Sequence, residues 1–298
     1  MVERSHRMLG VDVGGSSVKA SLCGVDGEWI DAISDPFASK DRNGIQSALL
    51  QAVDSLTEIS SEPALNSINS IGLCLPGKVA STGECIDLSL NLPALNGWRF
   101  EDMISVLGSR AGKRIDARVL VATDAHAAAY DFATEFPIEG RTAAISLGTG
   151  VGLCVLDEQY AVGIGHKGIG HLGQIDVGKL DDHDRIDEHG TLNSLESYIG
   201  SRALGHLIQG AKLDLSPLND DAFEVQALVR GLRIVHALYS PDRVVLLGGV
   251  GLAFGSLKDR LDRLVSRGLT PLAVDGAELL IGKHQYHAAR GAAKLAAC

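Results

Sequence analysis

The amino-acid sequence predicts an α/β protein built from two similar lobes. Short runs rich in β-formers alternate with longer amphipathic stretches along the 298 residues, as strands alternate with helices in this fold class. A strand, a glycine-rich turn and a second strand occur twice, around residues 12–19 and again around 146–152. This internal duplication favours two lobes facing each other across a central cleft, where small-molecule sites usually lie.

The first lobe is expected to open with a meander of strands. A helix is predicted from Gly44 to Ser60 because Ile45, Leu49 and Val53 recur at helical spacing. A later buried strand breaks at Pro76-Gly77. The expected strands are Met8–Val13, Lys19–Cys23, Glu28–Ile33, Ser70–Cys74 and Arg118–Ala122, and a second helix is expected over Phe100–Ala111.

The pattern restarts after Ala122. An alanine-rich helix is expected first, followed by a hairpin around the second glycine turn. We therefore expect an N-terminal lobe of residues 1–122, completed by the C-terminal helix 286–298, and a C-terminal lobe of residues 123–285. The expected strands are Thr142–Ser146, Gly152–Leu156 and Arg243–Leu247, and the expected helices are Asp124–Phe136, Leu192–Leu207, Ala222–Tyr239, Ser256–Arg267 and His287–Ala297.

Charge and cysteine content narrow the class of partner. The 27 Lys and Arg residues against 37 Asp and Glu give a net charge of −10, which argues against nucleic acid or an anionic membrane surface as partner. The five cysteines form no close-spaced pair, and residues 1–8 are polar and basic with no apolar region suited to export. No apolar stretch approaches the ~20 residues that span a bilayer. We expect a reduced, cytoplasmic protein.

The first glycine turn has the composition of a phosphate site. Adjacent glycines let backbone N–H groups approach an anion, and hydroxyl groups add further donors. Asp12, at the end of the preceding strand, can hold a metal ion or its water shell. The residues assigned to this turn are Asp12, Gly14, Gly15, Ser16, Ser17 and Lys19. A plain turn without a ligand is the alternative, and this segment alone leaves it open.

Two later glycine turns extend the same interpretation. Gly148, Thr149 and Gly150 can meet phosphates from the other lobe. Gly248 and Gly249 end a third apolar strand, where glycine lets a flat ligand such as adenosine approach the backbone. For each turn alone, tight packing of strand against helix is an equal alternative. The three in this order favour nucleotide binding.

Asp124 stands between the predicted strand Arg118–Ala122 and the helix that follows it. Aspartate is a good N-cap residue, and that role stabilises a helix by ~1 kcal/mol. A carboxylate at a lobe junction is also placed to accept a proton from a substrate hydroxyl. The local pattern leaves both roles open.

These motifs together resemble the ROK family of sugar kinases, within the actin/hexokinase-like (ribonuclease H-like) ATPase fold. The resemblance runs over nearly the whole length and is specific for fold and nucleotide use. It is carried by Asp12–Lys19, Leu75–Gly77, Asn91–Pro93, Trp98, Thr123–His126, Gly148–Gly152, Gly170–Gln174, Asn193–Glu196 and Leu247–Gly249.

The resemblance implies ATP- and magnesium-dependent phosphorylation of a sugar hydroxyl on a hexose or N-acylhexosamine. Asp124 matches the family's catalytic base. A homodimer is also implied. The sugar contacts that carry over are Gly77, Asn91, Thr123, His171, Gln174 and Glu196.

The chain departs from the family on the sugar side. Thr123 stands where the family usually has Asn. In the first phosphate turn Ser16-Ser17 stands where Thr is common, a mild change that keeps the hydroxyl. His171 replaces a sugar-binding carboxylate, as in some bacterial N-acetylmannosamine kinases; in an alternative register Gly168 takes that position.

This chain also departs from the residue pattern of the family's structural zinc site. It needs a histidine and three cysteines, and residues 187–194 contain no cysteine. Since thiolates supply most of the affinity of such a site, we do not expect structural zinc. A residual site drawn from His171, His183, Asp187 or His189 is the alternative.

Two other functions remain open at this stage. One is a non-catalytic sugar or nucleotide sensor, although only eight residues precede Leu9 and we expect no DNA-reading domain there. The other is a kinase of a divergent, non-hexose alcohol. The altered positions gather on the sugar side, so the sugar, the hydroxyl phosphorylated and the phosphoryl donor (ATP or polyphosphate) are left open.

Overall fold

The computed structural model describes residues 7–60, 68–111, 117–136, 139–164, 167–168, 170–187, 189–209, 212–274 and 276–298. The chain forms two compact units. Unit 1 contains Met1–Asp131 and Tyr286–Cys298, and unit 2 contains Phe132–Gln285. The division falls within helix α3 (Asp124–Glu135), whereas the sequence-based boundary lies at Ala122.

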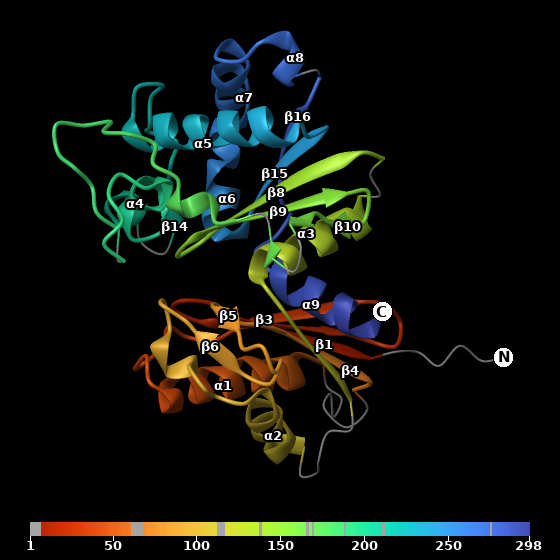
Figure 1. The fold of residues 1–298 in the computed structure, drawn as a ribbon. Coiled ribbons are helices and arrows are strands. Elements are labelled where there is room, and N and C mark those ends of the chain that lie inside the picture. The colour runs from red at the N-terminus through yellow and green to blue at the C-terminus, as the bar shows by residue number, and fades with distance from the viewer. Residues whose placement is uncertain are drawn as a thin grey trace. The chain divides into compact units, whose positions relative to one another are not determined.

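Unit 1 is built on a five-stranded sheet with the order β3-β2-β1-β4-β7 (Figure 1). The first three strands form an antiparallel meander, and β4 and β7 add to β1 in parallel. Asp12 on β1 pairs with Lys19 on β2 and with Cys74 on β4, which in turn pairs with Ala122 on β7. The strands are β1 (Met8–Val13), β2 (Val18–Cys23), β3 (Trp29–Ile33), β4 (Ser70–Cys74) and β7 (Arg118–Ala122).

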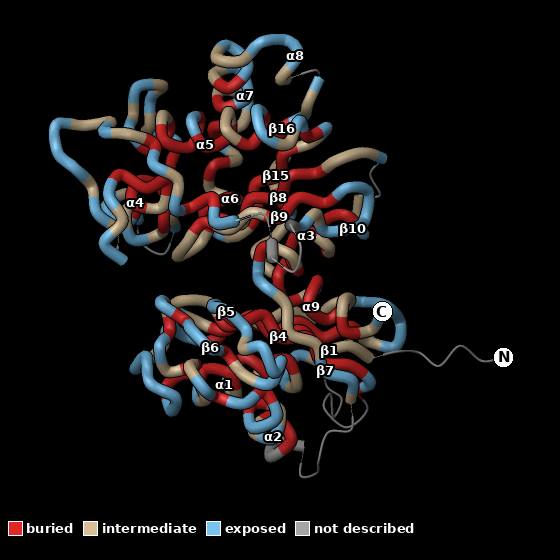
Figure 2. Tube along the Cα trace, viewed as in Figure 1, coloured by how far each residue is buried: buried red, intermediate tan, exposed pale blue. Residues whose placement is uncertain are grey.

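The two faces of this sheet carry different residues because side chains alternate along a strand. Leu9, Val11 and Ile71 lie in the apolar core with α1 (Arg42–Ser60) and α2 (Phe100–Ala111). The buried strands appear red in Figure 2. The other face bears small residues and is covered by α9 (His287–Ala297).

Helix α9 lies unusually close to the sheet. A Cβ atom added at Gly10 would overlap the carbonyl oxygen of Ala289, and one added at Gly72 would overlap that of Ala292. Helix backbone therefore rests on strand backbone at these two positions. The alanine-rich sequence of α9 matches this contact, since larger side chains would hold the helix away from the sheet.

A small hairpin of β5 (Lys78–Val79) and β6 (Ile86–Leu88) follows β4, with a 3-10 turn at Pro93–Leu95. Gly77 has a φ of +132°, and a Cβ there would come within 2.5 Å of the Leu88 carbonyl oxygen. Glycine at this position is therefore required by the backbone of the hairpin.

Unit 2 repeats the strand plan of unit 1. Its five-stranded sheet has the order β10-β9-β8-β15-β16, with an antiparallel meander on one side and two parallel strands on the other. The strands are β8 (Arg141–Leu147), β9 (Val151–Asp157), β10 (Tyr160–Ala161), β15 (Arg243–Leu247) and β16 (Glu278–Ile281). This shared topology confirms the internal duplication predicted from the sequence.

The helices of unit 2 enclose its apolar core, which includes Ile145, Leu246 and Tyr198. The longer helices are α5 (Phe223–Tyr239) and α7 (Lys258–Arg267). The short elements are η3 (Leu172–Gln174), α4 (Leu195–Ile199), η4 (Ala203–Leu207), α6 (Gly248–Ala253), η5 (Phe254–Leu257), α8 (Pro271–Val274) and the strand pairs β11 (Gly163–Ile164) with β12 (Lys167–Gly168) and β13 (Ile208–Gln209) with β14 (Lys212–Leu213).

Most predicted elements are confirmed within one or two residues, but the single helix over Leu192–Leu207 is wrong. Two short helices, α4 and η4, stand there. The chain turns extended at Gly200, where a Cβ would come within 3.0 Å of the Thr149 carbonyl oxygen. Packing against the second glycine turn therefore ends α4. The predicted helix Ser256–Arg267 begins as the 3-10 turn η5, and the sequence missed β16 and α6.

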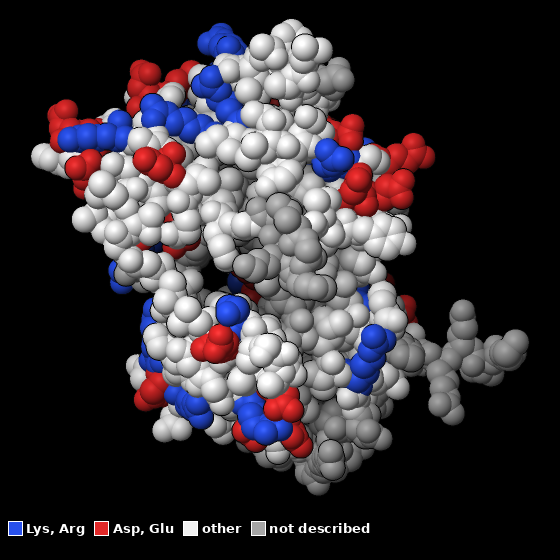
Figure 3. All heavy atoms as spheres, in the orientation of Figure 1, with Lys and Arg blue, Asp and Glu red and all other residues white. Residues whose placement is uncertain are grey.

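No helix among the described residues combines the length and apolar character needed to cross a bilayer. On the face shown in Figure 3, acidic and basic side chains are interspersed.

Candidate active site

The first glycine turn joins β1 to β2 through Gly14–Ser17. The Gly14 N–H donates to the Ser17 carbonyl oxygen at 3.0 Å, and the Ser16 carbonyl accepts from Phe37 N–H at 2.7 Å. Ser16 is exposed, and Ser17 is half-buried. The turn is thus held by its own backbone and by the segment after β3.

A charged pair flanks this turn on the two strands. Asp12 is buried, with 7% of its surface exposed, and its Oδ2 lies 3.6 Å from Lys19 Nζ. The ammonium group of Lys19 offsets part of the cost of burying this carboxyl group. Both side chains come from the cross-strand pair next to the turn, as the sequence pattern places them.

Asp124 is the first residue of α3, and Thr123 takes the N-cap position before it. The Thr123 hydroxyl accepts from His126 N–H at 3.3 Å, while Asp124 Oδ1 accepts from Ala125 N–H at 2.8 Å. In the described part of the chain no other residue donates a hydrogen bond to Asp124 Oδ2. The cap role that the sequence left open for Asp124 therefore belongs to Thr123.

The environment of Asp124 raises the pKa of its carboxyl group. The residue is exposed by surface area, yet the protein packed around it desolvates its carboxyl group. This desolvation, and then the charge of Asp12, raises the pKa of Asp124 above its usual range, against the hydrogen bond from Ala125. A carboxylate with a raised pKa is the stronger proton acceptor.

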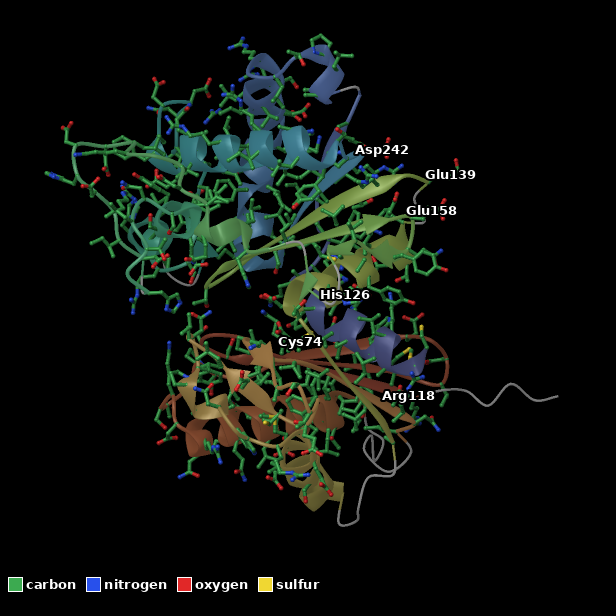
Figure 4. All side chains as sticks on the ribbon, in the orientation of Figure 1. Cys74, Arg118, His126, Glu139, Glu158 and Asp242 are labelled. Carbon is green, nitrogen blue, oxygen red and sulfur yellow. The ribbon has the colours of Figure 1, made fainter. Side chains whose placement is uncertain are left out.

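Cys74, labelled in Figure 4, is the last residue of β4 and pairs with Asp12 of β1. Burial, followed by the charges of Asp12 and Asp124, raises the pKa of its thiol well above the usual range. The thiol donates to the Ala288 carbonyl oxygen of α9 at 3.4 Å. Sequence analysis did not include Cys74 in the site; its place as the last residue of the strand beside Asp12 was the available signal.

Of the remaining unit 1 candidates, Asn91 is half-buried between β6 and the Pro93–Leu95 turn. Gly77 is accounted for by the hairpin backbone. Unit 1 therefore brings together Asp12, Lys19 and Asp124, all near the carboxyl ends of β1 and β7.

The second glycine turn, Gly148–Gly150, joins β8 to β9. The Gly148 N–H donates to the Gly150 carbonyl oxygen at 3.0 Å, and the Gly148 carbonyl accepts from Ser201 N–H at 2.9 Å. A Cβ added at Gly148 would meet no protein atom within 4 Å. Glycine at this position is therefore not required by packing within the protein.

Glu196 reaches this turn from α4. Its Oε2 accepts from Val151 N–H at 3.0 Å, and a Cβ at Gly150 or Gly173 would come within 3.0 Å of the same oxygen. The structure thus brings Glu196 together with Gly150. Its carboxylate is committed in part to the backbone of the turn.

His171 precedes η3 and Gln174 is its last residue, and both are exposed. Gln174 Oε1 accepts from the Thr191 hydroxyl at 2.7 Å, and its amide nitrogen donates to Asp187 Oδ2 at 3.4 Å. His171 precedes η3 and makes no side-chain cap. Gln174 is therefore part of a hydrogen-bonded loop.

The third glycine pair stands at the start of α6. Gly248 has a φ of +80°, and a Cβ there would overlap the Leu147 carbonyl oxygen, so the backbone requires glycine. Around Gly249 a Cβ would meet nothing within 4 Å. Gly249 therefore stands beside open space in the same way as Gly148.

The donor sets differ in their fit to metals. The carboxylate oxygens of Asp12 and Asp124 are the hard ligands that magnesium prefers. Residues 170–187 and 189–194 contain no set of His, Cys or acidic side chains whose ligand atoms lie close enough to share a metal ion. The residues present do not fit the family's structural zinc site, because its three cysteine ligands are missing from residues 187–194.

The duplicated sheets define a two-lobe ATPase fold of the actin/hexokinase type. The chain belongs to the ROK family, whose sequence model matches residues 8–298. No curated protein matches the chain significantly.

Solved structures of similar fold include enzymes and a regulator. A ROK family glucokinase from Streptomyces griseus, solved with glucose and AMPPNP, has 19% identity and a TM-score of 0.66 over 97% of this chain and 98% of its own. A putative N-acetylmannosamine kinase from Listeria monocytogenes has 14% identity and a TM-score of 0.69 over 98% of both chains. A ROK family transcriptional regulator, a homologue of the E. coli MLC protein, has 18% identity and a TM-score of 0.65 over 98% of this chain and 78% of its own. At these identities the likeness shows the fold.

Proposed function

We propose that this protein transfers a phosphoryl group from ATP to a hydroxyl of a hexose or N-acylhexosamine, with Asp124 as general base. The observation that carries this proposal is the state of Asp124. Thr123 takes the helix cap, no other residue of the described chain donates to one oxygen of Asp124, and the pKa of Asp124 is raised. A helix cap alone would need none of these features.

The reaction divides among the residues as follows. Asp124 takes the proton of the sugar hydroxyl as that oxygen bonds to the γ-phosphorus, and ADP departs with the electron pair of the broken P–O bond. Asp12 would hold magnesium, which neutralises phosphate charge when bound. Lys19 and the donors of Gly14, Gly15, Ser16 and Ser17 would bind phosphates, as would Gly148, Thr149 and Gly150, with Gly248 and Gly249 beside adenosine.

The sugar would contact Asn91, Thr123, His171, Gln174 and Glu196. Fixed polar side chains discriminate sugars well, because a missing hydroxyl leaves a buried partner unpaired. The S. griseus relative solved with glucose and AMPPNP supports this class of substrate. The family resemblance also supports a homodimer located in the cytoplasm.

The experiment is a coupled ADP-release assay with Mg-ATP against hexoses, 2-acetamido sugars and polyols. Asp124→Asn should lower turnover by about 10²–10⁴-fold, the usual contribution of a general base, while ATP binding measured by calorimetry persists. Asp102→Asn, an exposed acid on α2, is the matched control and should retain turnover.

Turnover retained in Asp124→Asn would remove Asp124 from the mechanism. Silence across the whole panel in the native protein, with ATP still bound, would favour a non-catalytic sensor. The fold shared with a ROK transcriptional regulator makes that the second candidate.

A further inference from the structure

The segment between η3 and α4 has little regular secondary structure. Within the described residues 175–187 and 189–194, the β-type contacts are isolated bridges, Asp176 with Ser194 and Ile186 with Leu192. Such a segment depends on side-chain hydrogen bonds for a defined conformation. This dependence matters because its two ends carry Gln174 and Glu196.

Asp187 is the centre of those hydrogen bonds. Its Oδ1 accepts from the backbone N–H groups of His189 and Thr191, both at 2.9 Å. Its Oδ2 accepts from the Ser194 hydroxyl at 2.8 Å and from the Gln174 amide at 3.4 Å. The carboxylate therefore ties its own turn to η3 on one side and to the start of α4 on the other.

The link continues from Ser194 to the second glycine turn. Ser194 is the N-cap of α4, and its hydroxyl oxygen accepts from Ser197 N–H at 3.2 Å while donating to Asp187. Helix α4 then carries Glu196 to Val151 N–H. On the other branch, Thr191 and Asp187 hold the two ends of the Gln174 amide.

We propose that Asp187 is a positioning residue that organises residues 174–187 and 189–196 by hydrogen bonding, without a metal ion, and so places Gln174 and Glu196 for the sugar. The proposal rests on the proposed function only in assigning those two side chains to the sugar. A carboxylate has about four acceptor positions. All are occupied here by the four donors, so none remains for zinc.

The electrostatics agree with this role. Burial acts to raise the pKa of Asp187, but the hydrogen bonds from Thr191, Ser194 and His189 outweigh it and leave the pKa below its usual range. The charged form is therefore the one that the loop stabilises. Asparagine at this position would keep the shape but point an amide N–H₂ group at other donors.

The experiment compares Asp187→Asn with Asp182→Asn, an exposed acid on the same segment that undergoes the same chemical change. The first readout is native-state trypsin cleavage after Lys179 and Arg185, which requires local opening of the segment. We expect cleavage about tenfold or more faster in Asp187→Asn and unchanged in Asp182→Asn. The native protein should contain no stoichiometric zinc, and EDTA should not change its cleavage rate.

The second readout tests positioning. For the sugar found in the activity screen, Asp187→Asn should raise the sugar KM several-fold while the ATP KM stays the same. Ser194→Gly removes one link to Asp187 while glycine remains a tolerated N-cap residue, and this variant should show intermediate cleavage. If Asp187→Asn fails to fold, the cleavage rate of Ser194→Gly tests the proposal in its place.

Equal cleavage in Asp187→Asn and Asp182→Asn would overturn the proposal, and so would stoichiometric zinc whose removal opens the segment. Cleavage requires no turnover, so a protein without kinase activity still tests Asp187. Faster cleavage with an unchanged sugar KM would also overturn the assignment of Gln174 and Glu196 through Asp187.

Discussion

The two glycine turns occupy the same place on two sheets of the same topology, yet they differ in charge. In unit 1 the residues paired across the hairpin are Asp12 and Lys19, whereas in unit 2 the corresponding pair is Ser146 and Gly152. Among the described residues, the carboxylate that accepts a hydrogen bond from the second turn comes from outside the hairpin, from Glu196 of α4. The two units thus share the same strand topology, but only the hairpin of unit 1 carries a charged pair next to its turn.

The two sheets also differ in the residues on the face that α9 covers in unit 1. Counted back from the turns, Gly10 and Gly72 of unit 1 correspond to Ala144 and Val245 of unit 2, and each pair is aligned across its sheet. Unit 1 uses the glycine pair to bring α9 onto strand backbone. Unit 2 fills the corresponding space with side chains. The fold therefore tolerates two solutions for the same face.

The largest expected effect is on stability, and it comes from disturbing the close contact between α9 and the sheet of unit 1. Gly72→Ala should destabilise unit 1 by about 3 kcal/mol, because the added methyl group would overlap the Ala292 carbonyl and force α9 from the sheet. Urea unfolding followed by tryptophan fluorescence measures unit 1 directly, since Trp29 and Trp98 both belong to it.

Gly205→Ala is the control for that experiment. It stands in unit 2, where a Cβ would meet no atom within 4 Å, and it should leave the fluorescence transition in place. Equal midpoints for the two variants would show that α9 does not depend on the glycine contact.

The strand plan was predictable because it depends on local pattern. The apolar run Met8–Val13 and the turn glycines predicted the first hairpin, and the same features recur in the second half. The helix over Leu192–Leu207 failed because its apolar spacing continues through Gly200, while the break is set by the distant carbonyl of Thr149. The alanine content of α9 was visible, but its cause was not.

The sequence predicted which residues belong to the candidate site better than it predicted the role of each residue. The sequence left the cap open for Asp124 and placed Thr123 against the sugar; the structure gives the cap to Thr123. Asp187 was considered only as a residual metal ligand, although it is a hydrogen-bond centre whose donors come from three segments. Such roles depend on which hydrogen-bond donors lie close together in the folded chain, and the spacing of residues in the sequence does not predict this.

The second glycine turn can be tested through Gly148, which packing within the protein does not require to be glycine. Gly148→Ala should weaken Mg-ATP binding by about tenfold, because the methyl group enters open space that the proposal gives to phosphate, while thermal stability stays the same. Calorimetric titration with a thermal melt measures both quantities, with Gly205→Ala as control. Undiminished ATP affinity would show that the second turn does not contact the nucleotide.

The smallest expected effect contrasts Asp124 of unit 1 with Asp187 of unit 2, whose pKa values shift in opposite directions. Since the folded pKa of Asp124 is raised, its ionisation costs stability, and that cost is present above the folded pKa and vanishes below the usual aspartate value near 4. Asp124→Asn should therefore melt higher than the native protein at pH 7 and equal to it in acid. Asp187 has a lowered pKa, so Asp187→Asn should melt lower at pH 7 and approach the native protein as pH falls. Thermal melts across pH measure both, and a lower melting temperature for Asp124→Asn at pH 7 would contradict the charge cost that suits Asp124 to accept a proton.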